Sequence, residues 1–166
     1  AAHADQLESL LNGFHDTTDI SFVTHSMGAL VLRELMARQS DWRDRLRVKR
    51  SVLIAPPNQG SAIARMVRDY ALYEWIFGPA GQELTPEAAG RLPLLRDSLA
   101  IIAGGDGNDG YNPLLAGDDD GTVTVAETRL EGAEDFLIVD DLHSSLSNDP
   151  HAVSAVLAYL RTGRFE

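Results

Sequence analysis

Residues 20–38 constrain the fold most, because an apolar run there passes directly into a helical pattern. Residues 20–24 (Ile-Ser-Phe-Val-Thr) are mostly β-branched or aromatic, which is typical of a strand. From Met27 onward the apolar residues recur at the spacing of a helix. Only His25 and Ser26 separate the two patterns, so the chain must turn sharply there. A strand, a tight turn and a helix in succession predict a layered α/β fold.

The rest of the chain continues to alternate between helices and strands. One helix is predicted before Gly13 and another after Pro150. Further strands are predicted at residues 51–55, 99–103, 122–128 and 136–139. The first two of these runs are almost entirely apolar, as in strands that are covered on both faces of a parallel sheet. We therefore predict one α/β domain over residues 1–166, with a largely parallel sheet and flanking helices.

The charge and composition exclude several classes of partner. The formal net charge of -11 argues against nucleic acid or an anionic membrane surface, because phosphates would be repelled. The chain has no cysteine, so it has no disulfide, no thiolate metal site and no cysteine nucleophile. No apolar run approaches the roughly 20 residues of a membrane span. Cellular compartment and oligomeric state are not specified by the sequence.

Ser26 lies at the turn, where its hydroxyl would be presented at the end of a strand. A serine hydroxyl becomes a strong nucleophile when a base accepts its proton and a third group orients that base. Downstream, Asp120 follows the third core strand and His143 follows the last one. The order serine, acid, histidine is the order found in α/β-hydrolases. These three residues are therefore the candidate catalytic set.

Five motifs in collinear order carry a wider resemblance. They are residues 24–28 (THSMG), 55–61 (APPNQGS), 78–82 (GPAGQ), 120–123 (DGTV), and the Leu142-His143 loop with residues 161–165 (RTGRF). Together they resemble the small bacterial lipase/esterase-like α/β-hydrolases, which are serine hydrolases that cleave lipid or small-molecule esters. The resemblance implies Ser26 as nucleophile, Asp120 as orienting acid and His143 as general base, with an acyl-enzyme intermediate and neither cofactor nor metal. The elbow geometry makes the backbone N–H of Met27 one oxyanion-hole donor.

The same resemblance implies that the chain is a partial α/β-hydrolase fold. Only 25 residues precede Ser26, whereas the family has several more strands there, including one that leads to the second oxyanion-hole N–H. We therefore expect an N-terminally truncated chain that lacks these strands and catalyses poorly, since losing one donor costs about 10²–10³ in turnover. The family also usually has glycine at the position of Thr24.

Residues 61–97 are predicted as a helical, lid-like insertion that is unusually aromatic. Two roles fit its aromatic group: lining an acyl pocket, for which Trp75 and Phe77 are candidates, or ordinary core packing. Pro57 and Asn58 follow the strand at 51–55 and are expected to border the same pocket.

Several residues have a simpler interpretation beside the catalytic one. Ser26 can be a serine that merely caps a helix. His25 adjoins Ser26, but neighbouring strand residues point to opposite faces, so we expect it to pack behind the site rather than act as the base. His3, His15 and His151 are assigned to solvent. Four other acidic residues compete with Asp120, namely Asp106, Asp109, Asp118 and Asp119.

The glycine-rich loop at residues 104–111 matches two other templates. Its spacing spells GxGxxG, but no helix follows, which disfavours a dinucleotide site. It also matches a single copy of a calcium-binding nonapeptide repeat, which needs stacked neighbours. A turn is the favoured role, with a calcium ion near the acidic loops as the lesser alternative.

Two other functions fit the same residues. A hydrolase-like fragment that binds a lipid or a protein partner without catalysis would keep the fold and not the chemistry. An acyltransferase would use the same triad and pass the acyl group to an acceptor other than water.

Overall fold

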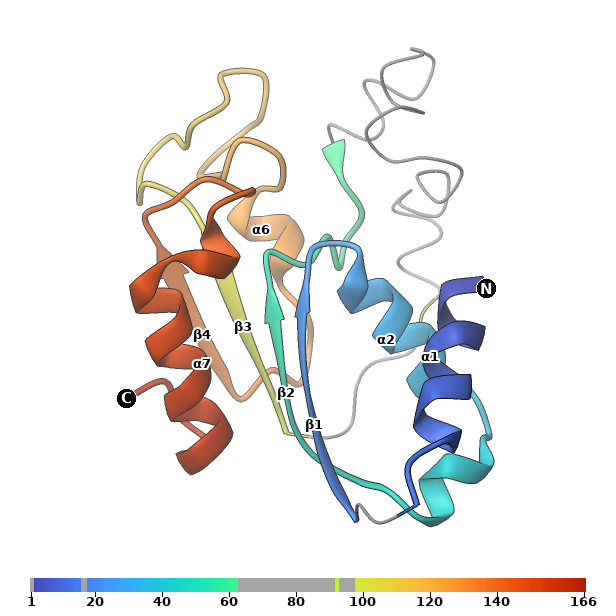
Figure 1. The fold of residues 1–166 in the computed structure, drawn as a ribbon. Helices are drawn as coiled ribbons and strands as arrows, with labels where there is room; N and C mark the ends of the chain where they lie inside the picture. The colour runs from blue at the N-terminus through green and yellow to red at the C-terminus, as the bar shows by residue number, and fades with distance from the viewer. Residues whose placement is uncertain (1, 16–17, 63–91, 93–97) are drawn as a thin grey trace.

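A computed structural model describes residues 2–15, 18–62, 92 and 98–166 of the chain (Figure 1). The predicted lid-like insertion, with Trp75 and Phe77, lies almost wholly outside the described residues and stays a prediction. The elements in chain order are α1 (Ala2–Asn12), β1 (Asp19–His25), α2 (Gly28–Ala37), η1 (Asp41–Asp44), β2 (Arg47–Ile54), β3 (Leu99–Gly104), α6 (Val125–Thr128), β4 (Asp135–Val139), η3 (Leu146–Asn148) and α7 (Pro150–Thr162).

The four strands form one parallel sheet in the order β1-β2-β3-β4. Neighbouring strands are in register at their carboxyl ends, where His25 of β1 lies opposite Ile54 of β2, and Ile54 lies opposite Ile102 of β3. Since the strands are parallel, the loops that leave their carboxyl ends emerge at one edge of the sheet. The predicted α/β class with a parallel sheet is confirmed.

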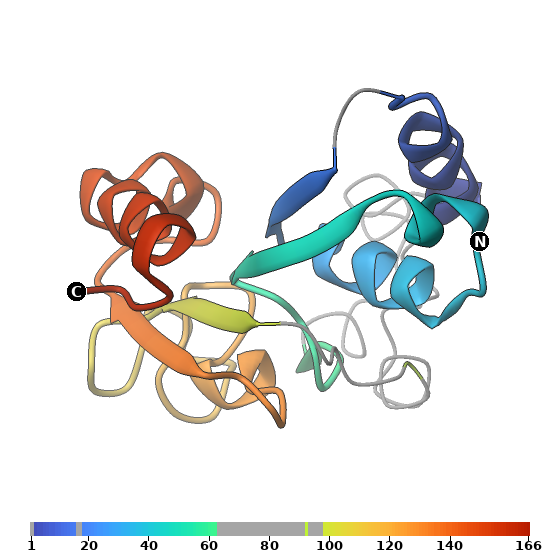
Figure 2. The ribbon, with the colours of Figure 1, turned by 90° about the horizontal axis from the view of Figure 1, so that it is seen from below.

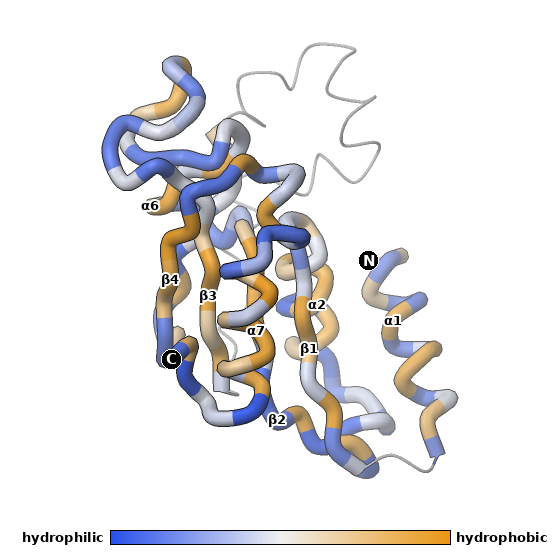
Figure 3. The backbone as a smooth tube through the Cα atoms, turned by 60° about the vertical axis from the view of Figure 1, so that its left-hand side comes forward, coloured by the Kyte–Doolittle hydropathy of each residue, from blue (hydrophilic) through white to orange (hydrophobic). Residues whose placement is uncertain are grey.

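Helices cover both faces of the sheet (Figure 2). Leu53, Leu99 and Ile101 pack toward α1 and α2, whereas the residues that alternate with them, such as Val52 and Ile102, pack toward α7. Successive side chains of a strand point to opposite faces, so a strand with helices on both sides must be apolar at every position. Figure 3 shows these apolar strands, and the mainly hydrophilic loop above β3 and β4.

The predicted strand at residues 122–128 is wrong, because part of this segment forms the short helix α6. The Thr124 hydroxyl accepts a hydrogen bond from the Glu127 N–H, and the Glu127 carboxylate accepts one from the Thr124 N–H. This reciprocal pair is a capping box, which starts a helix. The alternating β-branched residues favoured a strand, but the Thr-x-x-Glu spacing determines the local structure.

Strand β1 is the edge of the sheet within the part of the chain that the structure describes. It pairs with β2 on one side, and Val23 near its end is 47% exposed. None of the described helices is long and apolar enough to cross a membrane.

Candidate active site

Ser26 sits in a strained backbone conformation between β1 and α2. Its φ of 54° lies in the left-handed region, which costs an L-residue about 1–2 kcal/mol. Hydrogen bonds on both sides hold it there: the Ser26 N–H donates to the Ile54 carbonyl at 2.8 Å, and the Ala29 N–H donates to the Ser26 carbonyl at 3.1 Å. The sheet ladder and the first turn of α2 therefore meet at this residue and fix the direction of its side chain. This is the geometry that a nucleophile elbow requires.

Thr24 fits where the family usually has glycine. A Cβ placed on Gly28, the glycine on the other side of the elbow, would stand 3.5 Å from the Thr24 Cβ, which is ordinary van der Waals contact. The Thr24 side chain therefore fits at the elbow, and even a Cβ at position 28 would not clash with it. The Thr24 hydroxyl is buried and has no hydrogen-bond partner among the described residues.

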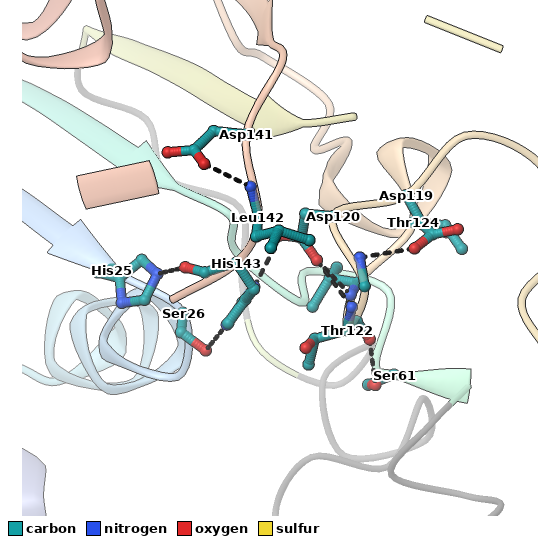
Figure 4. Close-up of polar contacts among 12 residues, drawn as sticks. His25, Ser26, Ser61, Asp119, Asp120, Thr122, Thr124, Asp141, Leu142 and His143 are labelled. Carbon is teal, nitrogen blue, oxygen red and sulfur yellow. Dashed lines mark hydrogen bonds and ion pairs between the residues drawn. The ribbon is translucent and has the colours of Figure 1, made fainter. Parts of the chain in front are cut away.

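The structure brings together the three predicted catalytic residues (Figure 4). The His143 Nε2 lies 2.9 Å from the Ser26 Oγ, and the His143 Nδ1 lies 2.7 Å from the Asp120 Oδ2. The Asp120 side chain is fully buried, and that of His143 is 15% exposed. Each of the three residues follows a different strand, so the parallel sheet places them at one edge.

Backbone groups hold Asp120 in the orientation that His143 needs. Its Oδ1 accepts hydrogen bonds from the N–H groups of Thr122 at 3.0 Å and Val123 at 2.7 Å, and its carbonyl accepts one from the His143 N–H at 2.8 Å. An ionised carboxylate can only accept, so the neutral His143 ring carries its proton on Nδ1. Nε2 is then the lone-pair nitrogen that faces the Ser26 hydroxyl.

Three of the four competing aspartates bond to backbone N–H groups of residues 106–121 instead of to His143. Asp118 accepts from the N–H groups of Asp106 and Gly107, and Asp119 accepts from those of Asn112 and Gly121. Asp106 accepts from the N–H groups of Asn108 and Gly110, and these bonds lower the pKa of its carboxyl group. Of the described acidic side chains, only that of Asp120 bonds to His143.

The described residues contain no group of three or more His, Cys, Asp or Glu side chains that could hold a metal ion. The carboxylates of Asp106, Asp118 and Asp119 accept hydrogen bonds from backbone N–H groups, which gives these three acidic residues a structural role. The alternative that these acidic residues bind a calcium ion therefore has no support from the described residues.

Met27 precedes α2 and has a helical backbone conformation. No described residue accepts a hydrogen bond from its N–H, which is one of the unsatisfied donors at a helix N-terminus. Its assignment as an oxyanion-hole donor stays a prediction.

Pro57 and Asn58 are both buried in the loop that leaves β2. The Asn58 amide donates to the Thr128 carbonyl of α6 at 2.7 Å, and the Asn58 carbonyl accepts from Arg33 at 3.1 Å. The polar groups of Asn58 are thus used within the protein, and its place in a substrate pocket is not tested by these contacts.

Arg33 is a buried residue that sequence reasoning missed. It lies on α2, is 2% exposed, and also donates to the Leu92 carbonyl at 2.7 Å. Burial lowers the pKa of its guanidinium. The feature of the sequence that could have indicated its burial is the position of a single arginine among the apolar residues of α2.

His25 packs against His143. The His25 Nε2 lies 2.9 Å from the His143 carbonyl oxygen, and the two ring centroids are 4.9 Å apart. The three remaining histidines, His3, His15 and His151, are exposed.

No protein-family model matches the sequence, and no curated protein matches it. Solved structures do match. The mature lipase BlEst2 of Bacillus licheniformis superposes with a TM-score of 0.66 at 16% identity, covering 98% of this chain and 71% of that one. The metagenomic carboxyl esterase MGS0156 also gives 0.66, at 20% identity, covering 86% of this chain and 50% of that one.

The chain therefore has an α/β-hydrolase-like fold and corresponds to part of the length of these two proteins. Its parallel sheet and flanking helices are features that the resemblance in the sequence implied.

Proposed function

We propose that this chain is a serine hydrolase of carboxylic esters in which Ser26 is the nucleophile, His143 the general base and Asp120 the acid that orients it. The observation that carries the proposal is the continuous hydrogen-bond path from the strained Ser26 through His143 to the buried Asp120. Two solved proteins with a similar fold are described as a lipase and a carboxyl esterase, which supports an ester as the substrate.

In the first half of the reaction, the Ser26 Oγ attacks the ester carbonyl carbon while its proton passes to the His143 Nε2. The negative charge that develops on the carbonyl oxygen is stabilised by the Met27 N–H. Buried and ionised, Asp120 stabilises the imidazolium that forms on His143. When the carbon–oxygen bond to the alcohol breaks, His143 donates its proton to the leaving alkoxide and an acyl group remains on Ser26.

In the second half, a water molecule takes the place of the alcohol. His143 accepts a proton from the water as its oxygen attacks the acyl carbon, and then returns the proton to the Ser26 Oγ as the carboxylic acid leaves. The residues of this chain supply every proton transfer in both halves.

A fluorophosphonate probe tests the proposal, since it reacts with a serine that a base has activated. We expect the purified chain to be labelled on the peptide that contains Ser26, and to release p-nitrophenol from a short-chain p-nitrophenyl ester. Ser26→Ala should abolish labelling and hydrolysis, whereas Ser9→Ala, at an exposed serine of α1, should change neither. A wild-type chain that stays unlabelled, or labelling that persists in Ser26→Ala, would overturn the proposal.

A further inference from the structure

Two consecutive residues of the nucleophile segment contact the same histidine. The Ser26 hydroxyl bonds to the ring of His143, and the ring of His25 bonds to the backbone carbonyl of His143 (Figure 4). His143 is separated from these residues by more than a hundred positions in the chain. The segment that carries Ser26 is therefore connected to His143 by two hydrogen bonds, one to the His143 side chain and one to its backbone.

The direction of the second bond follows from its chemistry. A carbonyl oxygen accepts hydrogen bonds and cannot donate, so the His25 Nε2 must carry the proton. In neutral His25 the lone pair is then on Nδ1. The hydrogen bond of 2.9 Å is at the usual length for an N–H donor and a carbonyl oxygen.

The other polar contacts of His143 tie it to the acid and not to the nucleophile strand. Its Nδ1 bonds to the Asp120 carboxylate, and its backbone N–H bonds to the Asp120 carbonyl. These two bonds make the base and acid one unit. Among the described residues, the bond from His25 is the contact that ties the backbone of this unit to β1, which delivers Ser26.

We propose that His25 is a positioning residue of the active site, which in its neutral form fixes the distance between Ser26 and His143 by holding the His143 carbonyl. The proposal rests on the proposed function and assigns no direct contact with substrate to His25. It explains why the residue beside the nucleophile is a ring with an N–H at its far end.

The charge state of His25 matters because the centroid of its ring lies 4.9 Å from that of the His143 ring. Within the described structure, the titratable groups that act on His25 are His143 and Asp120. Burial lowers the pKa of His25, and the neighbouring His143 ring lowers it further, against smaller effects in the opposite direction from its hydrogen bond and from Asp120. When His25 is neutral, it does not repel the positive charge that forms on His143 during the reaction. A protonated His25 would repel this charge and so disfavour the imidazolium.

Two substitutions separate the hydrogen bond from the shape of the ring. His25→Phe keeps an aromatic ring and removes the donor, and we expect kcat for p-nitrophenyl ester hydrolysis to fall by about 10–100-fold with little change in KM, since a misplaced base slows the proton transfer and not the binding. His25→Gln keeps an N–H at about the same reach and should recover most of this loss. His25→Leu is a second variant without a donor if the larger ring of phenylalanine prevents folding.

The pH dependence of activity distinguishes a positioning role of His25 from a merely structural one, because a structural role would leave it unchanged. Protonation of His25 would place positive charge beside His143, so wild type should lose activity more steeply on the acid side than His25→Gln, which has no titrating ring at this position. The matched control is His151→Gln, at an exposed histidine in the first turn of α7, which should keep the wild-type profile.

A measurement that does not depend on catalysis distinguishes failure of the positioning role of His25 from failure of the proposed hydrolase function. The downfield NMR resonance of the His143 Nδ1 proton reports its bond to Asp120 in any folded variant. We expect it to persist in His25→Gln and to broaden by solvent exchange in His25→Phe or His25→Leu. If these last variants keep both the resonance and the wild-type rate, or if His25→Gln loses as much as they do, the positioning role is wrong. Failure of fluorophosphonate to label any of the proteins would instead refute the proposed hydrolase.

Discussion

Replacement of Asp120 by asparagine tests how the structure selects the proton position on His143. The Asp120 Oδ1 accepts from the N–H groups of Thr122 and Val123, and the Oδ2 faces the His143 Nδ1 at 2.7 Å. An asparagine has one oxygen, and the two backbone donors will hold it at the Oδ1 position. Turning the amide around would leave these two N–H groups facing an NH₂ group, at a cost of about 1–3 kcal/mol for each unmade bond.

The amide NH₂ of the asparagine therefore points at the His143 Nδ1 and donates to it. The ring must then carry its proton on Nε2, where it faces Ser26 as a donor and cannot accept the serine proton. The same change in the triad of a serine protease lowers kcat by about 10⁴, which corresponds to about 5.4 kcal/mol of transition-state stabilisation. We expect a loss of this size in ester hydrolysis and in the rate of fluorophosphonate labelling.

Asp119→Asn is the matched control for this prediction. Asp119 is adjacent and equally buried, but its carboxylate bonds to the N–H groups of Gly121 and Asn112 and not to His143. We expect this variant to lose stability in urea unfolding while its labelling rate falls by less than about tenfold. The reasoning is refuted if folded Asp120→Asn keeps its rate within about tenfold of wild type, or if Asp119→Asn loses as much activity as Asp120→Asn.

Three further substitutions probe the surroundings of the site. Gly104→Ala should destabilise the fold by about 1–3 kcal/mol and slow labelling at least about tenfold, because its Cβ would lie 2.7 Å from the Asp120 Cβ and 2.8 Å from the Asp141 carbonyl oxygen, forcing the acid and histidine loops apart. Arg33→Met should cost about 2–4 kcal/mol in urea unfolding, because the carbonyls of Asn58 and Leu92 lose a buried donor. Thr24→Val should raise the unfolding free energy by about 1 kcal/mol, since it removes a buried hydroxyl without a partner; a loss of stability would contradict this.

The sequence predicted most of what depends on local pattern. The strand, turn and helix around Ser26 were predicted because strand and helix periodicities meet there without a linker, and the parallel sheet followed from apolar runs. The predicted strand at residues 122–128 was wrong because two local signals conflict and the capping box of Thr124 and Glu127 prevails. Asp120 could be ranked above its neighbours only by the resemblance. The competing residues are all aspartates, and they differ only in what their carboxylates contact in the folded protein.

The missed features depend on groups that are distant in the chain. Arg33 is stable in the interior because it donates to backbone carbonyls of Asn58 and Leu92, and no spacing in the sequence predicts which carbonyls will be within reach. For His25, the alternation of side chains along a strand predicted a residue behind the site. Its bond to the His143 carbonyl arises because the loop after β4 crosses the end of β1, which only the assembled sheet determines.

Backbone strain at the carboxyl edge of the sheet is shared by two neighbouring strands. Among the described non-glycine residues, only Ser26 and Ala55 have positive φ angles, 54° and 46°. Both follow strand ends, and both N–H groups continue the sheet: Ser26 bonds to Ile54, and Ala55 bonds to Ile102. Ladder bonds thus hold each residue in a conformation that glycine adopts more readily.

Ala55→Gly tests whether this strain is real. Relief of the left-handed conformation returns about 1–2 kcal/mol, against about 0.5–1 kcal/mol for the greater freedom of glycine in the unfolded chain and about 0.8 kcal/mol for the buried methyl group. The unfolding free energy should therefore stay within about 1 kcal/mol of wild type. Ala100→Gly, at a buried alanine of β3 in the same core cluster, has no strain to relieve and should cost about 1.5 kcal/mol. Equal losses for the two variants in urea unfolding would show that the backbone of Ala55 is not strained.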